Sequence, residues 1–267
     1  MTWKNSELLD VRGIKLQVAE KGEGQPLLFL HSGVSPTIYS DNYLSELAKT
    51  YRVIAPSHPG FGQSGLPRHF TSVNDLAYFY LDFLDAMSLN DVILIGASFG
   101  GWIAAELTVR STSRISHLVL AAPFGIKVSD RETRDIADFY AVPQSEWPAL
   151  SFHDPARWSP DYTRLAEPEL LEVARGRETM AFLGWSPFMH NRSLRFWLHR
   201  IDVPTLIVRG KQDRIIGRDY AQSFVDEIAG ARLLEIDGAG HFPHIEKARD
   251  FADGVRSLVA DRRRAVA

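Results

Sequence analysis

The chain has 267 residues, of which 45% are hydrophobic and 24% are charged, a composition typical of a well-packed globular protein with one large domain or one domain that carries an insertion. The formal net charge of −3 is small, which excludes the strongly basic surface of a typical nucleic-acid binder. Because the chain has no cysteine, disulfides, thiolate catalysis and cysteine-ligated metals are excluded.

The stretch MTWKNSELLDVRG at the start of the sequence lacks the apolar core of a signal peptide. No apolar run is long enough to cross a bilayer. We therefore expect a cytoplasmic protein with no membrane partner and no nucleic-acid partner. The basic run of Arg262, Arg263 and Arg264 is typical of a solvated tail. The sequence leaves open whether the protein is a homodimer.

Short apolar runs predict the strands of a central sheet. The first is ELLDVRGIKLQVAEKGEG, two alternating segments that meet near Arg12 and Gly13 and predict a hairpin. Later runs are continuously apolar, which is typical of strands that are buried on both faces. In chain order these runs are PLLFLH, YRVIAPS, DVILIG, SHLVLAAP, PTLIVRG and ARLLEID.

Helical patterns separate these runs. In SVNDLAYFYLDFLDAMS the apolar residues recur at three- and four-residue steps, and Ser72 with Asp75 predicts a capping box at the start. Further predicted helices are GGWIAAELTVRS, DYAQSFVDEIAG and ARDFADGVRSLVADRR. The alternation of buried strands and helices predicts an α/β fold with a mainly parallel central sheet flanked by helices.

The alternation is interrupted once. From about Phe124 to Leu198 there is no strand-like run, and helical patterns, prolines and large aromatic residues dominate. We expect a helical cap inserted at residues 124–198 into a core that is made of residues 1–123 and 199–267.

One serine has the setting of a nucleophile. Gly96-Ala97-Ser98-Phe99-Gly100 fits G-x-S-x-G directly after a predicted strand and directly before a predicted helix, the context of a nucleophile elbow. The flanking glycines relieve crowding at the strained turn that exposes the hydroxyl. The helix N-terminus directs amide groups toward developing negative charge. A turn that only permits tight packing is the alternative, and the context favours the nucleophile.

A serine nucleophile needs a base and an acid that orients the base. His241 follows the last predicted strand and a loop of small residues, so we expect it at the carboxyl edge of the sheet. His244 is the alternative, for which we expect a structural or pocket role. Asp213 directly follows a predicted strand and is the expected acid. The alternatives are Asp219, at the start of a predicted helix, and Asp237, in a turn.

The loop FLHSGVSP ends a predicted strand and can supply an oxyanion hole. We expect the backbone amides at Gly33 and Phe99 to bind the oxyanion, and the hydroxyl of Ser32 can add a donor. Taken alone, the segment is an ordinary Gly-Ser loop. No histidine or carboxylate spacing predicts a metal site and no phosphate-binding loop occurs, so we expect no cofactor.

Five segments, LHSG, VIAPSHPGFGQS, GASFGG, GKQDRI and GAGHFPHIE, resemble the α/β-hydrolases that carry a helical cap. The resemblance covers nearly the whole chain. It implies a nucleophile, acid, base and oxyanion hole at Ser98, Asp213, His241, Gly33 and Phe99. The family's loop that matches SHPGFGQS usually begins with an aspartate, whereas this chain has Ser57-His58. Because that loop is largely architectural in the family, we expect no catalytic role for His58.

The resemblance also reduces the number of reactions that the chain is expected to catalyse. Haloalkane dehalogenases and epoxide hydrolases of this fold carry an aspartate where this chain has Ser98. Carboxylic-ester hydrolases and the carbon–carbon bond hydrolases of meta-cleavage products remain. The latter typically carry Asn before the nucleophile and Trp after the histidine, whereas this chain has Ala97 and Phe242. We therefore predict ester hydrolysis through an acyl-enzyme, with carbon–carbon cleavage as the alternative. The third interpretation, a non-catalytic ligand receptor, fits less well because all three triad residues are present.

We expect the cap to cover an apolar pocket for a small apolar or aromatic substrate. Most cap aromatics must pack its helices together, whereas the turn-rich segment near residue 187 favours contact with the substrate. Arg177 or Arg192 is either a ligand for a substrate carboxylate or a solvated charge. The predicted substrate contacts are Ser32, Trp185, Phe188, Met189 and Phe242.

Overall fold

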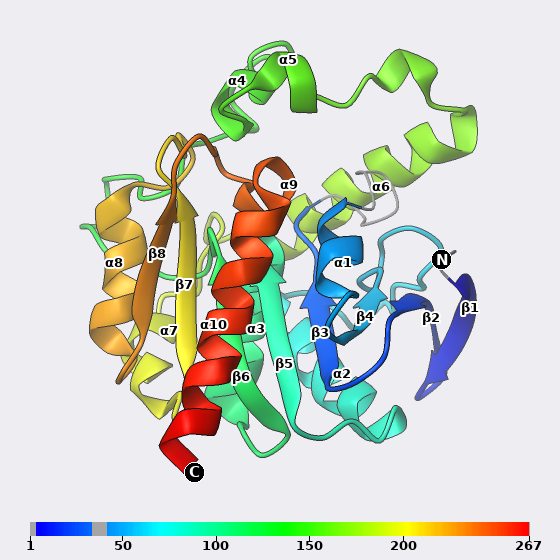
Figure 1. Ribbon diagram of the computed structural model, residues 1–267. Helices are drawn as coiled ribbons and strands as arrows, with labels where there is room; N and C mark the ends of the chain where they lie inside the picture. Colours follow the sequence, from blue (N-terminus) through cyan, green and yellow to red (C-terminus); the bar gives the residue numbers. More distant parts are fainter. Residues whose placement is uncertain (1–3, 34–41, 267) are drawn as a thin grey trace.

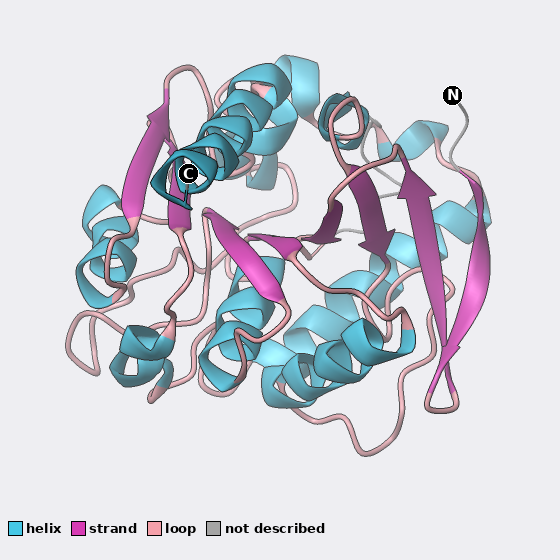
Figure 2. Ribbon diagram, turned by 60° about the horizontal axis from the view of Figure 1, so that its bottom comes forward, coloured by secondary structure: helices cyan, strands magenta, loops and turns pink. Residues whose placement is uncertain are grey.

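The computed structural model describes residues 4–33 and 42–266 of the chain. Within these residues, eight strands form one sheet in the order β1-β2-β4-β3-β5-β6-β7-β8, and helices cover both of its faces (Figures 1 and 2). The strands are β1 (Lys4–Val11), β2 (Ile14–Lys21), β3 (Pro26–Leu30), β4 (Arg52–Pro56), β5 (Val92–Ala97), β6 (Ile115–Ala121), β7 (Thr205–Gly210) and β8 (Arg232–Ile236).

The sheet is mainly parallel, as the sequence predicts. Strand β2 pairs antiparallel with β1 and with β4, whereas every neighbouring pair from β4 to β8 is parallel. The β1–β2 turn places Arg12 and Gly13 at φ values of 48° and 84°, the two left-handed residues that a tight two-residue hairpin turn requires. The hairpin prediction is therefore confirmed.

Successive side chains of a strand point to opposite faces, so each buried strand contributes to two cores. In β3, Leu28 and Leu30 join the core beneath α2, α3 and α8. Leu27 and Phe29 of the same strand join the core beneath α1 and α10. These flanking helices are α1 (Asn42–Leu47), α2 (Val73–Ala86), α3 (Phe99–Arg110), α8 (Arg218–Glu227) and α10 (Ala248–Val266).

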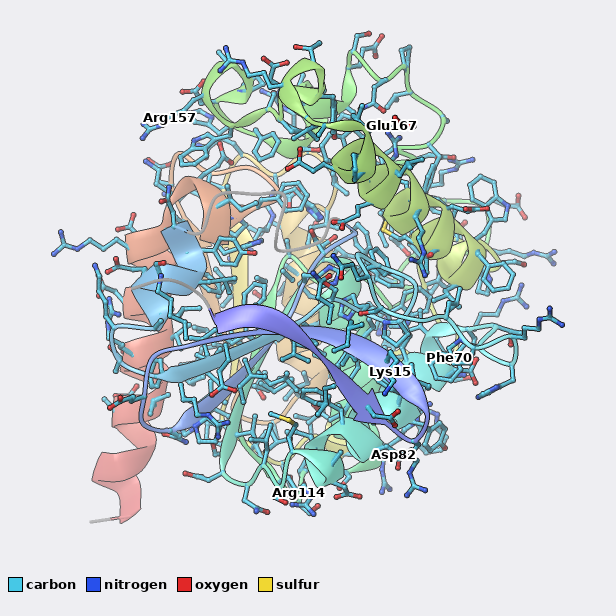
Figure 3. The ribbon with its side chains drawn as sticks, turned by 90° about the vertical axis from the view of Figure 1, so that its right-hand side faces the viewer. Lys15, Phe70, Asp82, Arg114, Arg157 and Glu167 are labelled. Atoms are coloured by element: carbon cyan, nitrogen blue, oxygen red, sulfur yellow. The ribbon has the colours of Figure 1, made fainter. Side chains whose placement is uncertain are left out.

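The segment between β6 and β7 adds no described residue to the sheet. Its helices α4, α5 and α6 lie beyond the carboxyl ends of the parallel strands (Figure 1), and Figure 3 marks this region with Arg157 and Glu167. The division of the chain into core and cap at residues 124 and 198 stays a prediction. The elements here are α4 (Trp147–Ser151), α5 (Pro155–Trp158), η1 (Tyr162–Arg164), α6 (Glu167–Gly184), α7 (Leu194–Trp197) and η2 (Leu198–Arg200).

Among the described residues, no helix combines the length and the apolarity that crossing a bilayer requires.

Candidate active site

Ser98 lies on the turn between β5 and α3, with φ 53° and ψ −112°. A positive φ is strained for any residue with a side chain, and such strain is common at functional turns. The turn is held in place because the Ser98 N–H donates to the Ala121 carbonyl at 2.8 Å. Only 4% of the serine is exposed, so its hydroxyl meets solvent only through the cavity described below.

The two glycines of the motif permit close backbone approach around this turn. A Cβ atom at Gly96 would lie 2.3 Å from the Gly100 carbonyl oxygen. A Cβ atom at Gly100 would lie 2.1 Å from the Leu30 carbonyl oxygen, at the end of β3. These distances are shorter than any real contact of a Cβ atom, so the start of α3 can approach β3 and β5 only with glycine at both positions.

An unbroken chain of hydrogen bonds joins Ser98 to a carboxylate. The Oγ atom of Ser98 lies 2.8 Å from Nε2 of His241, and Nδ1 of His241 lies 3.0 Å from Oδ2 of Asp213. A carboxylate only accepts, so Nδ1 carries the proton and Nε2 is free to accept from the serine hydroxyl. The other oxygen, Oδ1, accepts from the N–H groups of Ile215 and Ile216 at 2.8 and 3.1 Å, which fixes the carboxylate.

The alternatives for base and acid lie elsewhere. Asp219 is in the first turn of α8. The Asp237 carboxylate accepts from Gln212 at 3.2 Å, and this bond lowers the pKa of the carboxyl. His244 is buried in α9 (Pro243–Glu246), where burial lowers its pKa to about 3. Of the candidates in the sequence, the structure brings Asp213 and His241 to the serine.

The loop that carries His241 is anchored by Glu246, a residue that no sequence motif indicates. The His241 N–H donates to the Ser151 carbonyl at 2.8 Å. The buried carboxylate of Glu246 accepts from the N–H groups of Gly240 at 2.5 Å and of His153 at 2.9 Å. One acidic side chain therefore holds the histidine loop against the link between α4 and α5.

A cavity opens beside the serine. Aromatic and aliphatic side chains dominate its wall. Arg177 is the one Lys, Arg, Asp or Glu residue among the described residues that line it. The wall consists of Ser32, Gly33, Ser98, Phe124, Phe139, Tyr140, Trp147, Tyr162, Val173, Arg177, Met180, Ile215, His241 and Phe242.

The expected oxyanion residues lie around this cavity. Gly33 and Ser32 line it directly. Phe99 has a buried side chain, and it is the first residue of α3, whose opening N–H groups have no acceptor within the helix. Gly33 and Phe99 thus lie in the segments that follow β3 and β5, and their role as oxyanion donors stays a prediction.

The structure corrects three of the five predicted substrate contacts. Ser32 and Phe242 line the cavity, whereas Trp185, Phe188 and Met189 do not. Trp185 and Phe188 line a separate surface hollow. Their rings pack at 5.8 Å against Tyr140 and Phe139 respectively, which form the wall between the two spaces. Met189 is fully buried. A turn-rich sequence did not indicate which side of this wall the residues occupy.

Two phenols of the cavity wall, Tyr140 and Tyr162, lie near Arg177. Its guanidinium donates to the side chain of Gln144, and its backbone carbonyl accepts from the Tyr140 hydroxyl at 3.1 Å. Burial raises the pKa of Tyr140 to about 12, and burial also raises the pKa of Tyr162. Both phenols therefore stay protonated donors at neutral pH. Arg192, the other candidate for a carboxylate ligand, lines the separate surface hollow instead.

No group of three or more His, Asp or Glu side chains in the described part of the chain is arranged to hold a metal ion.

Comparison with known proteins agrees with this architecture. The model of the alpha/beta hydrolase family matches residues 27–254. The chain is similar to the 2-hydroxymuconate semialdehyde hydrolase of Pseudomonas sp. (strain CF600), with 30% identity over 259 residues, which cover 93% of this chain and 92% of the relative.

Two solved structures share the fold. A meta-cleavage product hydrolase from Pseudomonas fluorescens IP01 has a TM-score of 0.76 and 21% identity, with coverage of 94% of this chain and 96% of the other. A thermophilic esterase from Thermogutta terrifontis has a TM-score of 0.75 and 20% identity, with coverage of 98% and 99%.

Proposed function

Because the chain belongs to the α/β-hydrolase family, we propose that it is a serine hydrolase that cleaves a small carboxylic ester through an acyl-enzyme on Ser98. The observation that carries the proposal is the hydrogen-bond chain from Asp213 through His241 to Ser98 at the wall of the apolar cavity. This arrangement supplies a nucleophile, its base and the group that orients the base.

Acylation follows from these positions. His241 Nε2 accepts the hydroxyl proton as Ser98 Oγ attacks the ester carbonyl carbon, and the carbonyl oxygen becomes an oxyanion. The amides of Gly33 and Phe99 stabilise that oxyanion, while Asp213 stabilises the imidazolium. When the intermediate collapses, the bond to the alcohol oxygen breaks, and the alcohol leaves with the proton from His241 Nε2. The acyl group remains on Ser98.

Deacylation repeats these steps with water. His241 Nε2 accepts a proton from water as its oxygen attacks the acyl carbon, and the same amides bind the second oxyanion. Collapse returns the proton to Ser98 Oγ and releases the carboxylic acid. The ester has then been hydrolysed, and the enzyme returns to its starting state.

The cavity wall also indicates the kind of substrate. Most of the wall is apolar, whereas Arg177 places one positive charge beside the protonated hydroxyls of Tyr140 and Tyr162. A guanidinium recognises a carboxylate through paired hydrogen bonds. The proposed substrate is therefore an ester with an apolar or aromatic part and a carboxylate that faces Arg177.

Carbon–carbon bond cleavage is the second candidate. It is favoured by the 30% identity to a protein named 2-hydroxymuconate semialdehyde hydrolase. Such a reaction moves a proton onto a substrate carbon before the nucleophile attacks, which requires polar groups beside the serine. The neighbours of the site are Ala97, without a side-chain donor, and Phe242, without an indole N–H. Ester hydrolysis needs neither group and is therefore the first candidate.

Steady-state kinetics on purified protein distinguishes the two reactions. We expect the value of kcat/KM for a carboxylate-bearing aryl or alkyl ester to exceed that for any 2-hydroxy-6-oxo-dienoate by at least about tenfold, which is about 1.4 kcal/mol of transition-state stabilisation. A preference for the dienoate would establish carbon–carbon cleavage as the function and would show that other groups supply the proton transfer.

A further inference from the structure

Two histidines outside the proposed triad lie stacked behind the loop that ends β3. The ring centroids of His31 and His58 are 3.7 Å apart, with 26° between the ring planes, and at most 1% of either residue is exposed. His31 directly precedes Ser32 and Gly33 of the cavity wall. The fully buried Tyr80 closes the cluster on the far side, where its hydroxyl lies 2.5 Å from Nδ1 of His58.

The hydrogen bonds of this cluster determine the tautomers of both rings. The His58 backbone N–H can only donate, so Nε2 of His31, at 2.9 Å, accepts and carries no proton. The proton of His31 is therefore on Nδ1, which donates to the Ser32 carbonyl at 2.6 Å. Nε2 of His58 faces the His31 carbonyl at 2.8 Å and must carry the proton. Nδ1 of His58 then accepts from the Tyr80 hydroxyl.

The bond from His31 to the Ser32 carbonyl fixes a peptide plane that matters for catalysis. The Ser32 carbonyl and the Gly33 N–H belong to one peptide unit, and in a trans peptide these two groups point in opposite directions. When His31 holds the carbonyl on its own side, the Gly33 N–H must point away from the histidine pair. Gly33 itself lines the cavity beside Ser98, on the side of the peptide from which its N–H group can reach a reacting oxygen.

We propose that His31 is a positioning residue for the oxyanion hole, and that His58 and Tyr80 hold it in the tautomer that orients the Gly33 amide. The inference rests on the proposed serine hydrolase function. His31 touches no substrate in this account and acts through the Ser32–Gly33 peptide. The same cluster reaches the other oxyanion residue, since the ring of Phe99 packs edge-on against that of His58, with 6.2 Å between centroids.

Two substitutions test the two hydrogen bonds of the His31 ring one at a time. In His31→Asn, the amide nitrogen takes the place of Nδ1 and can still donate to the Ser32 carbonyl. In His31→Gln, the amide oxygen reaches the place of Nε2 and can still accept from the His58 N–H, whereas the donor to Ser32 is lost. Each variant keeps one buried hydrogen bond of the ring and loses the other, so the pair is matched for structural damage.

The readout is the second-order rate at which a fluorophosphonate labels Ser98, followed by intact mass, because the reaction places a phosphoryl oxygen in the oxyanion hole. We expect His31→Gln to lower this rate by about 10- to 100-fold, less than the roughly 10²- to 10³-fold loss on removing an oxyanion donor outright, because the Gly33 amide stays in the chain and loses only its fixed direction. His31→Asn should retain at least about a fifth of the wild-type rate. In steady-state assays with an ester substrate, His31→Gln should lower kcat and leave KM unchanged.

His117→Gln, at a buried histidine near the start of β6, is the control and should stay within about twofold of wild type. Urea unfolding of each variant checks that the labelled protein is folded. Equal losses in His31→Asn and His31→Gln, or a loss that appears only in KM, would overturn the role of His31 and leave the proposed function standing. A folded wild-type protein that is not labelled at Ser98 would overturn both.

Discussion

Ser98 is held in a backbone conformation that its own side chain disfavours. A residue other than glycine at φ 53° and ψ −112° costs on the order of 1–3 kcal/mol, and such a residue persists only where the surroundings leave no alternative. Here the strand before it, the helix after it and the bond to the Ala121 carbonyl impose the turn. The strain presents the hydroxyl to His241, so the conformation serves the chemistry at a cost in stability.

Asp213 holds the imidazole of His241 through a hydrogen bond. Its replacement by asparagine should therefore abolish most of the activity. Replacing Asp213 with Asn leaves a side chain that can donate to Nδ1, which favours the tautomer in which Nε2 cannot accept the serine proton. We expect kcat for a small ester to fall by about 10³- to 10⁴-fold. Asp237→Asn, at the exposed alternative, should stay within about twofold. The opposite ranking in steady-state assays would assign the acid to Asp237.

Arg177 should determine selectivity and not the chemical step. Arg177→Gln is expected to lower kcat/KM for a carboxylate-bearing ester by about 10- to 100-fold, the effect of one charge-assisted hydrogen-bonded contact. The value for a neutral ester of the same shape should change by no more than about threefold. Arg192→Gln, in the separate hollow, is the matched control. Equal losses for charged and neutral esters would show that Arg177 supports the wall instead.

At the scale of elements, the site forms where several strands and one helix converge. The carboxyl ends of β3, β5, β7 and β8 lead in turn to the proposed oxyanion loop, nucleophile, acid and base. Neighbouring parallel strands end at the same edge of the sheet, so residues far apart in the chain come together there. The close approach of α3 to β3 completes the arrangement, and it depends on the absence of a Cβ atom at Gly100.

That approach gives a prediction about stability. In Gly100→Ala, the added Cβ would lie 2.1 Å from the Leu30 carbonyl oxygen and 2.4 Å from that of His31, so α3 must move away from β3. We expect the free energy of unfolding in urea to fall by about 3 kcal/mol or more, with loss of activity. Gly217→Ala is the control, because its Cβ would meet no atom within 4 Å. A change of less than about 1 kcal/mol is expected there.

The sequence was sufficient to predict the strands and to select Ser98, Asp213 and His241, which the structure joins by hydrogen bonds, because both depend on local patterns. A strand buried on both faces needs a continuous apolar run, and each proposed catalytic residue follows such a run, His241 after a short loop of small residues. The short helix α1 and the positions of Trp185 and Phe188 could not be predicted in this way. They depend on packing between segments that are distant in sequence, which leaves no periodic pattern.

The role of Glu246 shows the same limit. Its carboxylate accepts hydrogen bonds from the backbone N–H groups of Gly240 and His153. Because every residue except proline has such a group, the side chains of the partners do not indicate the contact. The resemblance implies an architectural role for the loop that begins with Ser57-His58, and the structure shows the contacts of these two residues. His58 carries the second ring of the stacked pair, and Ser57 donates to Gln17 at 3.2 Å.

At the scale of the whole molecule, two fully buried neutral histidines link stability to pH. Burial lowers the pKa of His58 and of His244 from 6.5 to about 3. Between these values the unfolded chain binds protons that the folded chain does not, so stability is complete above pH 6.5 and is lost as the pH falls. We expect urea unfolding to give a free energy lower by about 1.4 kcal/mol per histidine at pH 5.5 than at pH 7.5.

His244→Phe tests the assignment of this pH dependence. The His244 ring packs among Phe29, Tyr43, Phe242 and Phe251, so a phenyl ring suits the environment and cannot titrate. Any packing cost shifts the free energy of unfolding equally at both pH values. The loss between pH 7.5 and 5.5 should shrink by about 1.4 kcal/mol in this variant. An unchanged loss would mean that other groups cause the pH dependence.

Acylation of Ser98 is measured by rapid-quench mass spectrometry with a p-nitrophenyl ester. We expect a burst of about one p-nitrophenolate per chain and an acyl adduct on the peptide that contains Ser98. Both should be absent in Ser98→Ala, whose unfolding in urea should match wild type and whose kcat should be lower by about 10⁴- to 10⁶-fold. Turnover by the folded protein with no adduct at Ser98, or a variant within tenfold of wild type, would contradict the proposed acylation of Ser98.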